Sequence, residues 1–175
     1  MSGHSSQTST KQVAEPVELF VSYSHLNATW FNRLLPLLKF RNPSAKIVHD
    51  WHDQELQAGD RWDDEIQAAL RRMDVFVCLM SYEFLASDYI IEVELDHALA
   101  REKKGEVEIV PILLFDMDLK NDCPELYSFN PLPAWGKCWS AYEQNGGHYQ
   151  NAHKPIRIGL RQAIQKVSEK RKQDK

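Results

Sequence analysis

The sequence of 175 residues contains little cysteine and no long hydrophobic run. Its three cysteines, Cys78, Cys123 and Cys138, are too few and too scattered for a disulfide framework, and their spacing fits no zinc-binding motif. The longest apolar runs, such as 109–115, are far shorter than the roughly 20 residues of a membrane-spanning helix. Residues 1–10 lack the apolar segment of a secretory signal. We therefore expect a cytoplasmic protein with no membrane partner.

An excess of positive charge is also missing. The formal net charge is −4 at pH 7, which gives no electrostatic reason to expect a nucleic-acid partner. Hydrophobic residues make up 43% and charged residues 26%, values that argue against general disorder. The length favours a single domain with a real core. We expect a disordered leader over 1–16, the domain over 17–168 and a charged, solvated tail over 169–175.

Strand-like and helix-like segments alternate along the middle of the chain. Short apolar runs predict buried parallel strands over 17–22, 45–49, 75–80 and 107–115, and a short fifth strand is expected near 136–140. Apolar residues at helical spacing predict helices over 27–39, 61–72 and 155–167 and a mostly helical segment over 82–101, in which Ser87 is an N-cap candidate. This order predicts an α/β, flavodoxin-like three-layer sandwich with a central parallel sheet of about five strands in the order 2-1-3-4-5.

Three polar and aromatic segments are expected to meet at one edge of this sheet. Residues 22–25 follow the first strand, 50–59 follow the second, and Ser81 with the helix that carries Glu92 and Glu94 follows the third. Ligands of such sheets bind beyond the carboxyl ends of the strands. Plain connecting loops are rich in Gly, Pro and Asn instead, so these segments are the candidate site.

Four stretches in this order resemble the Toll/interleukin-1 receptor (TIR) domain family, and its bacterial members in particular. They are FVSYSH at 20–25, DWHDQELQAGDRWDDEI at 50–66, FLASDYIIEVELDHAL at 84–99 and VEIVPILLFDMD at 107–118. The resemblance covers roughly residues 17–167, and the fold expected from the periodicity agrees with the fold of that family.

The resemblance implies an activity. Many bacterial and plant TIR domains cleave NAD at the nicotinamide–ribose bond and release nicotinamide with ADP-ribose or a cyclic ADP-ribose isomer. Other members, mostly animal adaptors, only bind one another. The resemblance therefore implies an NAD+ nucleosidase that uses NAD+ as substrate and needs no cofactor. It also implies activation by self-association with other TIR domains and a role in bacterial defence or signalling.

This chemistry needs a carboxylate near the ribose, because the transition state is oxocarbenium-like. Glu92 and Glu94 compete for the role. In many family members an aromatic residue precedes the glutamate by four positions, whereas here Tyr89 precedes Val93 by four. Helix geometry favours Glu94, which falls on the apolar side of the predicted helix, over Glu92, whose neighbours are more polar. We expect Glu94 to be the catalytic residue.

The loop after the first strand supplies further candidates for substrate binding. Tyr23, Ser24 and His25 are expected to form a floor for the nicotinamide ribose, with Tyr23 or Phe20 packed against a ring. The side chain of Phe20 is more simply a core residue. Tyr89 is expected to shield one side of the ribose, next to Asp88.

The second loop contributes Trp51 and Asp53, followed by Trp62 at the start of a helix. Trp51 either stacks on adenine, inserts into a neighbouring subunit or folds back on the core. Trp62 shares a helix face with apolar residues, so a core position competes with substrate binding. His49, His52 and Asp53 are not expected to make a metal site, because good sites need three or four converging ligands and no second cluster supports these three.

Two other functions stay open. A TIR-like scaffold would self-associate without turnover. A nucleoside deoxyribosyltransferase-like enzyme shares the sheet type and a ribosyl-centre glutamate, and it is distinguished by offering nucleosides and NAD side by side. A response-regulator receiver is excluded, because it requires acidic residues after the first and third strands, where this chain has Ser22 and Ser81.

Overall fold

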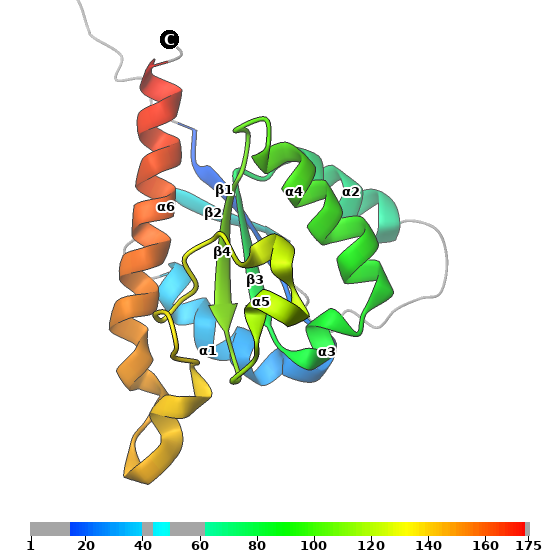
Figure 1. The fold of residues 1–175 in the computed structure, drawn as a ribbon. Coiled ribbons are helices and arrows are strands. Elements are labelled where there is room, and N and C mark those ends of the chain that lie inside the picture. The colour runs from blue at the N-terminus through cyan, green and yellow to red at the C-terminus, as the bar shows by residue number, and fades with distance from the viewer. Residues whose placement is uncertain (1–14, 40–43, 50–61, 174–175) are drawn as a thin grey trace, which may run out of the picture.

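A parallel sheet lies at the centre of the structure, a computed structural model that describes residues 15–39, 44–49 and 62–173 (Figure 1). In these residues its strands are β1 (Val17–Ser22), β2 (Ala45–His49), β3 (Val75–Met80) and β4 (Glu108–Leu113). Their order is β2-β1-β3-β4, and every neighbouring pair is parallel. All of β3 is buried, as expected for a central strand of a sheet covered on both faces.

Helices cover both faces of the sheet and complete the predicted three-layer sandwich. On one face lie α1 (Ala28–Lys39) and α6 (His153–Gln173), and on the other α2 (Trp62–Arg72) and α4 (Asp96–Glu102) (Figure 1). Alternate side chains of β3 enter the two cores, because successive residues of a strand point to opposite faces. None of the helices in the described part of the chain is both long and apolar enough to cross a bilayer.

The helix expected over 82–101 is broken into three pieces: α3 (Tyr82–Leu85), the π-helical turn η2 (Ile90–Leu95) and α4. Two serines cap helical starts here, since each accepts a hydrogen bond from a backbone N–H three residues later, and the cap at Ser87 explains the break after α3. The Oγ of Ser81 accepts from Phe84 at 3.0 Å, and the Oγ of Ser87 accepts from Ile90 at 3.4 Å. A serine N-cap favours a new helix start over continuation of the preceding helix.

The expected fifth strand does not form in the described residues as a regular strand. Leu132 makes an isolated bridge to Ile112, and the N–H of Trp139 donates to the carbonyl of Leu113 at 2.7 Å. Between these contacts the chain turns at Gly136, whose φ of 69° is in the left-handed region that glycine adopts readily. The segment therefore pairs with β4 only through isolated contacts and not as a continuous strand.

The remaining short helices lie in the loops that follow β1 and β4. They are η1 (His25–Asn27), α5 (Leu119–Asp122), η3 (Pro124–Leu126), η4 (Ser140–Gly146) and η5 (Tyr149–Ala152).

The end of α6 is anchored to the amino-terminal edge of the sheet. The helix continues to Gln173, so residues 169–173 are helical and not a separate tail. Nη2 of Arg171 donates to both carboxylate oxygens of Asp74 at 2.7 Å, and Asp74 Oδ2 also accepts from the N–H of Glu18 at 2.7 Å. This ion pair joins α6 to the residue before β3 and to β1.

Arg171→Ala is expected to lower the melting temperature by a few degrees. Losing a charge-assisted hydrogen bond to a half-buried carboxylate costs about 1 kcal/mol once solvent screening is allowed for, which is a shift of that size in a domain of this length. Lys172→Ala, on the exposed side of the same helix turn, is the matched control. Thermal unfolding followed by circular dichroism measures both, and equal melting temperatures would contradict the anchoring role.

Candidate functional site

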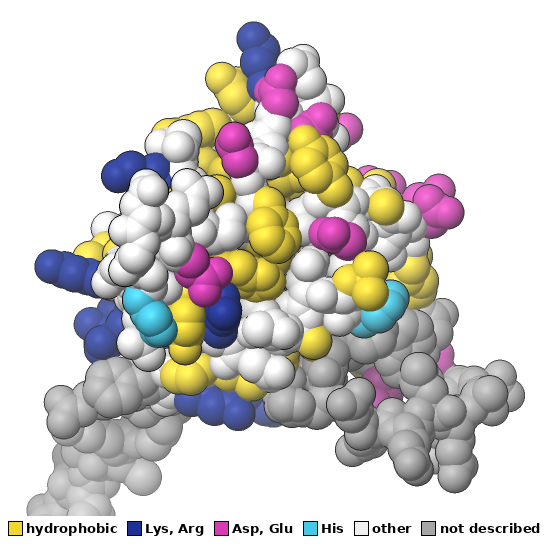
Figure 2. All heavy atoms as spheres, turned by 90° about the horizontal axis from the view of Figure 1, so that it is seen from below, with side chains coloured by type: hydrophobic (Ala, Val, Ile, Leu, Met, Phe, Trp, Pro, Cys, Tyr) yellow, Lys and Arg dark blue, Asp and Glu magenta, His cyan; other side chains and the backbone are white. Residues whose placement is uncertain are grey.

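The loops that leave β1 and β3 lie side by side at the carboxyl edge of the sheet. The chain passes from β1 to β2 on one side and later to β3 on the other, so the order of the strands reverses between β1 and β3. This switch point is where ligands bind in open α/β sheets. Seen from this edge, hydrophobic and acidic side chains are interspersed on the surface (Figure 2).

Glu94 is a carboxylate buried at this edge, with 1% of its surface exposed. Its Oε2 accepts a hydrogen bond from the hydroxyl of Ser22, the last residue of β1. Its Oε1 is also buried and has no hydrogen-bond partner among the described residues. Glu92, by contrast, is exposed. The structure thus agrees with the helix-face argument that distinguished the two glutamates, and the catalytic role of Glu94 stays a prediction.

The environment of Glu94 changes its acidity. Burial raises the pKa of Glu94 to about 7, while the hydrogen bond from Ser22 acts in the opposite direction. The side chain is therefore divided between its neutral and ionised forms near neutral pH. A carboxyl group of this kind is suited to proton transfer or to stabilising a developing cation, and strongly shifted pKa values are concentrated at functional sites.

Glu94 is carried by the π-helical turn η2, and not by the regular α-helix assumed in the sequence argument. Ile90, Glu94 and Leu95 are the buried residues of this turn. π-Helical turns are rare and frequently occur at functional sites, because they re-aim side chains within a helix. The local geometry and the buried carboxylate therefore mark the same six residues of the chain.

A cleft of about 550 Å³ opens beside this turn. It is lined by Tyr23, Ser24, His25, Leu26, Glu83, Ala86, Ser87, Tyr89 and Ile90. The cleft thus brings together four of the predicted binding residues, which come from the loop after β1 and from the start of the Glu94 helix. Its volume lies in the range typical of small-molecule sites. Glu94 lies one helical turn after Ile90, and Ser22 directly precedes Tyr23, so the buried pair adjoins the lining of the cleft.

Other predicted residues lie elsewhere. Phe20 is fully buried and stacks on Phe76, with ring centroids 5.8 Å apart, so its assignment to substrate binding is corrected to a core role. The ring of Tyr23 stacks on Phe31 at 4.5 Å, which places most of it in the core as well. Asp88 is exposed and does not line the cleft.

Part of the predicted site lies outside the described residues. This concerns Trp51 and Asp53, together with His52. Trp62 begins α2, but its side chain is likewise not described. Within the described part of the chain, no group of three or more His, Cys, Asp or Glu side chains is arranged to hold a metal ion.

Two buried polar residues, Ser81 and Asn27, join the loops after β1 and β3. The hydroxyl of Ser81 donates to Oδ1 of Asn27 at 2.6 Å. The backbone N–H of Glu83, with Ser81 and Asn27 beside it, lowers the pKa of Glu83, which therefore places a negative charge at the wall of the cleft. The sequence does contain a sign of buried polar residues at this edge, because Ser22 and Ser81 are the polar residues at the ends of two apolar runs.

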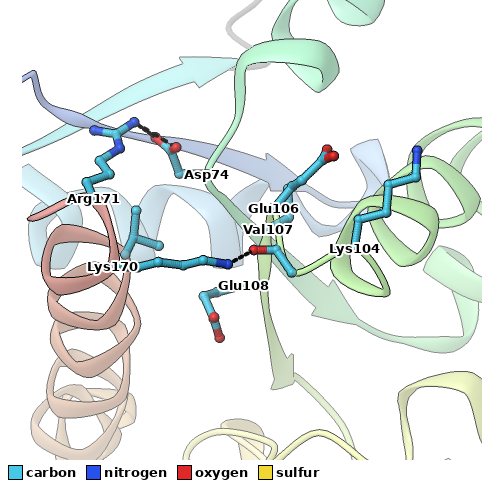
Figure 3. A pocket seen from close by; sticks show the side chains of 9 residues that line it. Asp74, Lys104, Glu106, Val107, Glu108, Lys170 and Arg171 are labelled. Carbon is cyan, nitrogen blue, oxygen red and sulfur yellow. Dashed lines mark hydrogen bonds and ion pairs between the residues drawn. The ribbon is translucent and has the colours of Figure 1, made fainter. Parts of the chain in front are cut away.

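A second cavity, of about 350 Å³, lies at the opposite edge of the sheet, beside the end of α6 (Figure 3). Two of its cationic side chains are engaged within it: Arg171 binds Asp74, and Nζ of Lys170 donates to the carbonyl of Gly105. This edge holds the amino ends of the strands, so the cleft at the carboxyl edge is the candidate functional site.

Comparison with known proteins identifies the domain type. A family model described as TIR domain matches residues 19–145, which is more than half of the chain. The uncharacterized protein y4lF of Sinorhizobium fredii (strain NBRC 101917 / NGR234) is 31% identical over 96 residues, which are 55% of this chain and 29% of that protein. The chain therefore matches less than a third of that relative's length.

Among solved structures, the chain is similar to the TIR domains of the activated Roq1 resistosome, which directly recognizes the pathogen effector XopQ. The TM-score is 0.44 at 20% sequence identity, and the similarity covers 87% of this chain and 84% of that chain.

The raised pKa of Glu94 predicts how stability depends on pH. Between the unfolded value near 4.5 and the folded value of about 7, the folded chain binds the proton more tightly than the unfolded chain. Stability contributed by the neutral carboxyl is therefore present at pH 4.5 and is lost as the pH rises to 7, by about 3 kcal/mol in total.

Glu94→Gln removes this dependence, so its melting temperature relative to the unmodified chain is expected to rise between pH 5 and pH 7 and then level off. Glu92→Gln, which changes an exposed carboxylate two residues away, is expected to show a constant difference. Differential scanning calorimetry across this range measures both, and parallel curves for the two variants would show that Glu94 is not held neutral by burial.

Proposed function

The chain belongs to the TIR domain family, and from this premise we propose that it is an NAD+ nucleosidase. It cleaves the bond between nicotinamide and ribose and releases nicotinamide with ADP-ribose or a cyclic ADP-ribose isomer. The observation that supports this function best is the buried carboxylate of Glu94 beside a cleft at the switch point of the sheet. Burial of a carboxylate is costly, and a site that stabilises a cation is a reason to retain one.

The proposed reaction requires a fixed negative charge and little else. The bonding electrons of the C–N bond leave with nicotinamide, which becomes neutral, and positive charge develops on the ribose. An ionised Glu94 stabilises this charge, and its low-dielectric surroundings strengthen the interaction. The oxygen of water then forms the new bond to the ribose carbon and releases a proton. When the product is cyclic, a nitrogen of adenine takes the place of water.

The lining of the cleft suits such a substrate. Tyr89, Leu26 and Ala86 offer apolar surface to a ring, and Ser24 and His25 offer polar groups beside it. In the same proposal NAD+ is the substrate and no resident cofactor takes part. We further propose that the chain acts in the cytoplasm, is activated by self-association with other TIR domains, and serves in defence or signalling.

One observation favours a second candidate, a TIR module that binds partners without turnover. The carboxylate of Glu94 is 1% exposed, so in this conformation no substrate reaches it. An enzyme with this site needs a rearrangement of the turn η2 or of the surrounding loops before it can act. Incubation of the chain with NAD+ over a range of protein concentrations, with chromatography of the products, separates the two candidates.

Glu94→Gln is expected to lower the rate of NAD+ cleavage about 10²- to 10³-fold, because it keeps the shape of the side chain and removes its charge. Glu92→Gln is the matched control and is expected to retain most of the activity, since Glu92 is exposed. Release of nicotinamide, measured by chromatography at saturating and at low NAD+, reports both variants.

Each other outcome has a distinct meaning. Full activity of Glu94→Gln together with loss of activity in Glu92→Gln would show that the other glutamate is catalytic. Full activity of both variants would contradict the carboxylate mechanism. No cleavage by the unmodified chain at any concentration would support the non-catalytic module.

A further inference from the structure

We propose that Ser22 is a positioning residue for Glu94: its hydroxyl holds one carboxylate oxygen in place and leaves the other for the substrate. The inference rests on the proposed function, because it assigns the two oxygens of the same carboxylate to different tasks. Oε2 is held by the protein, and Oε1 is the oxygen that meets the hydroxyl groups of the ribose.

The position of Ser22 is fixed by the sheet. It is fully buried, ends β1, and pairs in register with Cys78 of the central strand β3. Its hydroxyl has one proton to donate, and it is donated to Glu94. The contact spans 72 residues of sequence and ties a rigid strand to the π-helical turn. A carboxylate held from the sheet is kept in one orientation, which is what an electrostatic role in catalysis requires.

The second oxygen of Glu94 supports the assignment. A buried acceptor without a hydrogen-bond partner is rare in folded proteins, because the missing bond destabilises the structure. Oε1 is such an acceptor in the described part of the chain. Tyr23, the residue after Ser22, and Ile90, one helical turn before Glu94, both line the cleft. A ligand that enters by displacing the cleft wall therefore meets an acceptor that the protein has left unused.

Other titratable groups around Glu94 do not account for its state. Glu83 on α3 has its pKa lowered, chiefly by its own backbone N–H. Glu92, on the same π-helical turn as Glu94, is exposed. His97 on α4 has its pKa lowered by burial and by nearby cations, and burial strongly raises the pKa of Cys78 on β3. Burial and Ser22 are the two influences on Glu94 itself, and they oppose each other.

Because burial and Ser22 shift the pKa of Glu94 in opposite directions, that pKa is a measurement that a serine with only a structural role would not change. Ser22→Ala removes a donor that favours the ionised carboxylate, so the pKa of Glu94 is expected to rise by about one unit. In the cleavage assay the acidic limb of the pH–kcat/KM profile moves upward, and the loss is several-fold larger at pH 6.5 than at pH 8.5. Ser22→Thr keeps the hydroxyl and is expected to keep the profile. Ser168→Ala, which removes a hydroxyl from α6 far from the cleft, is the control.

The closing experiment titrates the carboxyl group without NAD+. Infrared difference spectra between pH 5 and pH 9 show the protonated carboxyl band, and its loss in Glu94→Gln assigns it. The expected midpoint is about 7 in the unmodified chain and about one pH unit higher in Ser22→Ala. If Ser22→Ala does not fold, Ser22→Cys replaces it, because a thiol is a weak donor.

An unchanged midpoint in a folded Ser22 variant would overturn the inference. A raised midpoint with an unchanged pH–rate profile would overturn it too, because the hydrogen bond would then have no effect on catalysis. Absence of NAD+ cleavage by the unmodified chain would overturn the proposed function instead. The titration still tests the hydrogen bond from Ser22 to Glu94 in that case, because it needs no turnover.

Discussion

The hydrogen bond between Ser22 and Glu94 is the contact on which the carboxyl edge of this domain depends. It joins the end of a central strand to a π-helical turn, and through it Ser22 donates to a carboxylate that is almost completely buried. A buried carboxyl group costs little when it is neutral or fully hydrogen-bonded. Here burial favours the neutral form and the bond from Ser22 favours the ionised form, and the resulting pKa is about 7. The cleft beside it places this balance where a ligand can change it.

The surrounding fold holds the two ends of this contact in place. β1 and β3 lie side by side in the middle of the sheet, with helices over both faces, so Ser22 has little freedom to move. A second buried pair, Ser81 with Asn27, joins the loops that leave the same two strands. At the opposite edge, Arg171 and Asp74 tie α6 to the start of β3. The carboxyl edge is thus free to carry an irregular turn because the rest of the sheet is well anchored.

Sequence patterns predicted the layers of the fold better than its interruptions. The four strands were predicted because buried parallel strands are continuous apolar runs, which local inspection detects. The break in the helical segment over 82–101 was predicted only in part: Ser87 was an N-cap candidate, but the apolar periodicity continues through the break and indicates one helix. The fifth strand was overestimated because the turn at Gly136 divides its pairing with β4.

The same distinction applies to the candidate site. Burial of Glu94 and exposure of Glu92 followed from the apolar face of one helix, which is local information. The partner of Glu94 did not, because a contact across 72 residues depends on the register of two elements. The core position of Phe20, against Phe76, agrees with the simpler of the two interpretations of its sequence, because strand alternation is local information.

The most direct test of this account is a crystal structure of the chain with an NAD+ analogue whose nicotinamide–ribose bond resists cleavage. The account predicts the analogue in the cleft between Tyr23 and Tyr89, with a ribose hydroxyl within hydrogen-bond distance of Glu94 Oε1 and with Ser22 still bound to Oε2. An analogue bound elsewhere, with Glu94 still closed off from the ligand, would contradict it.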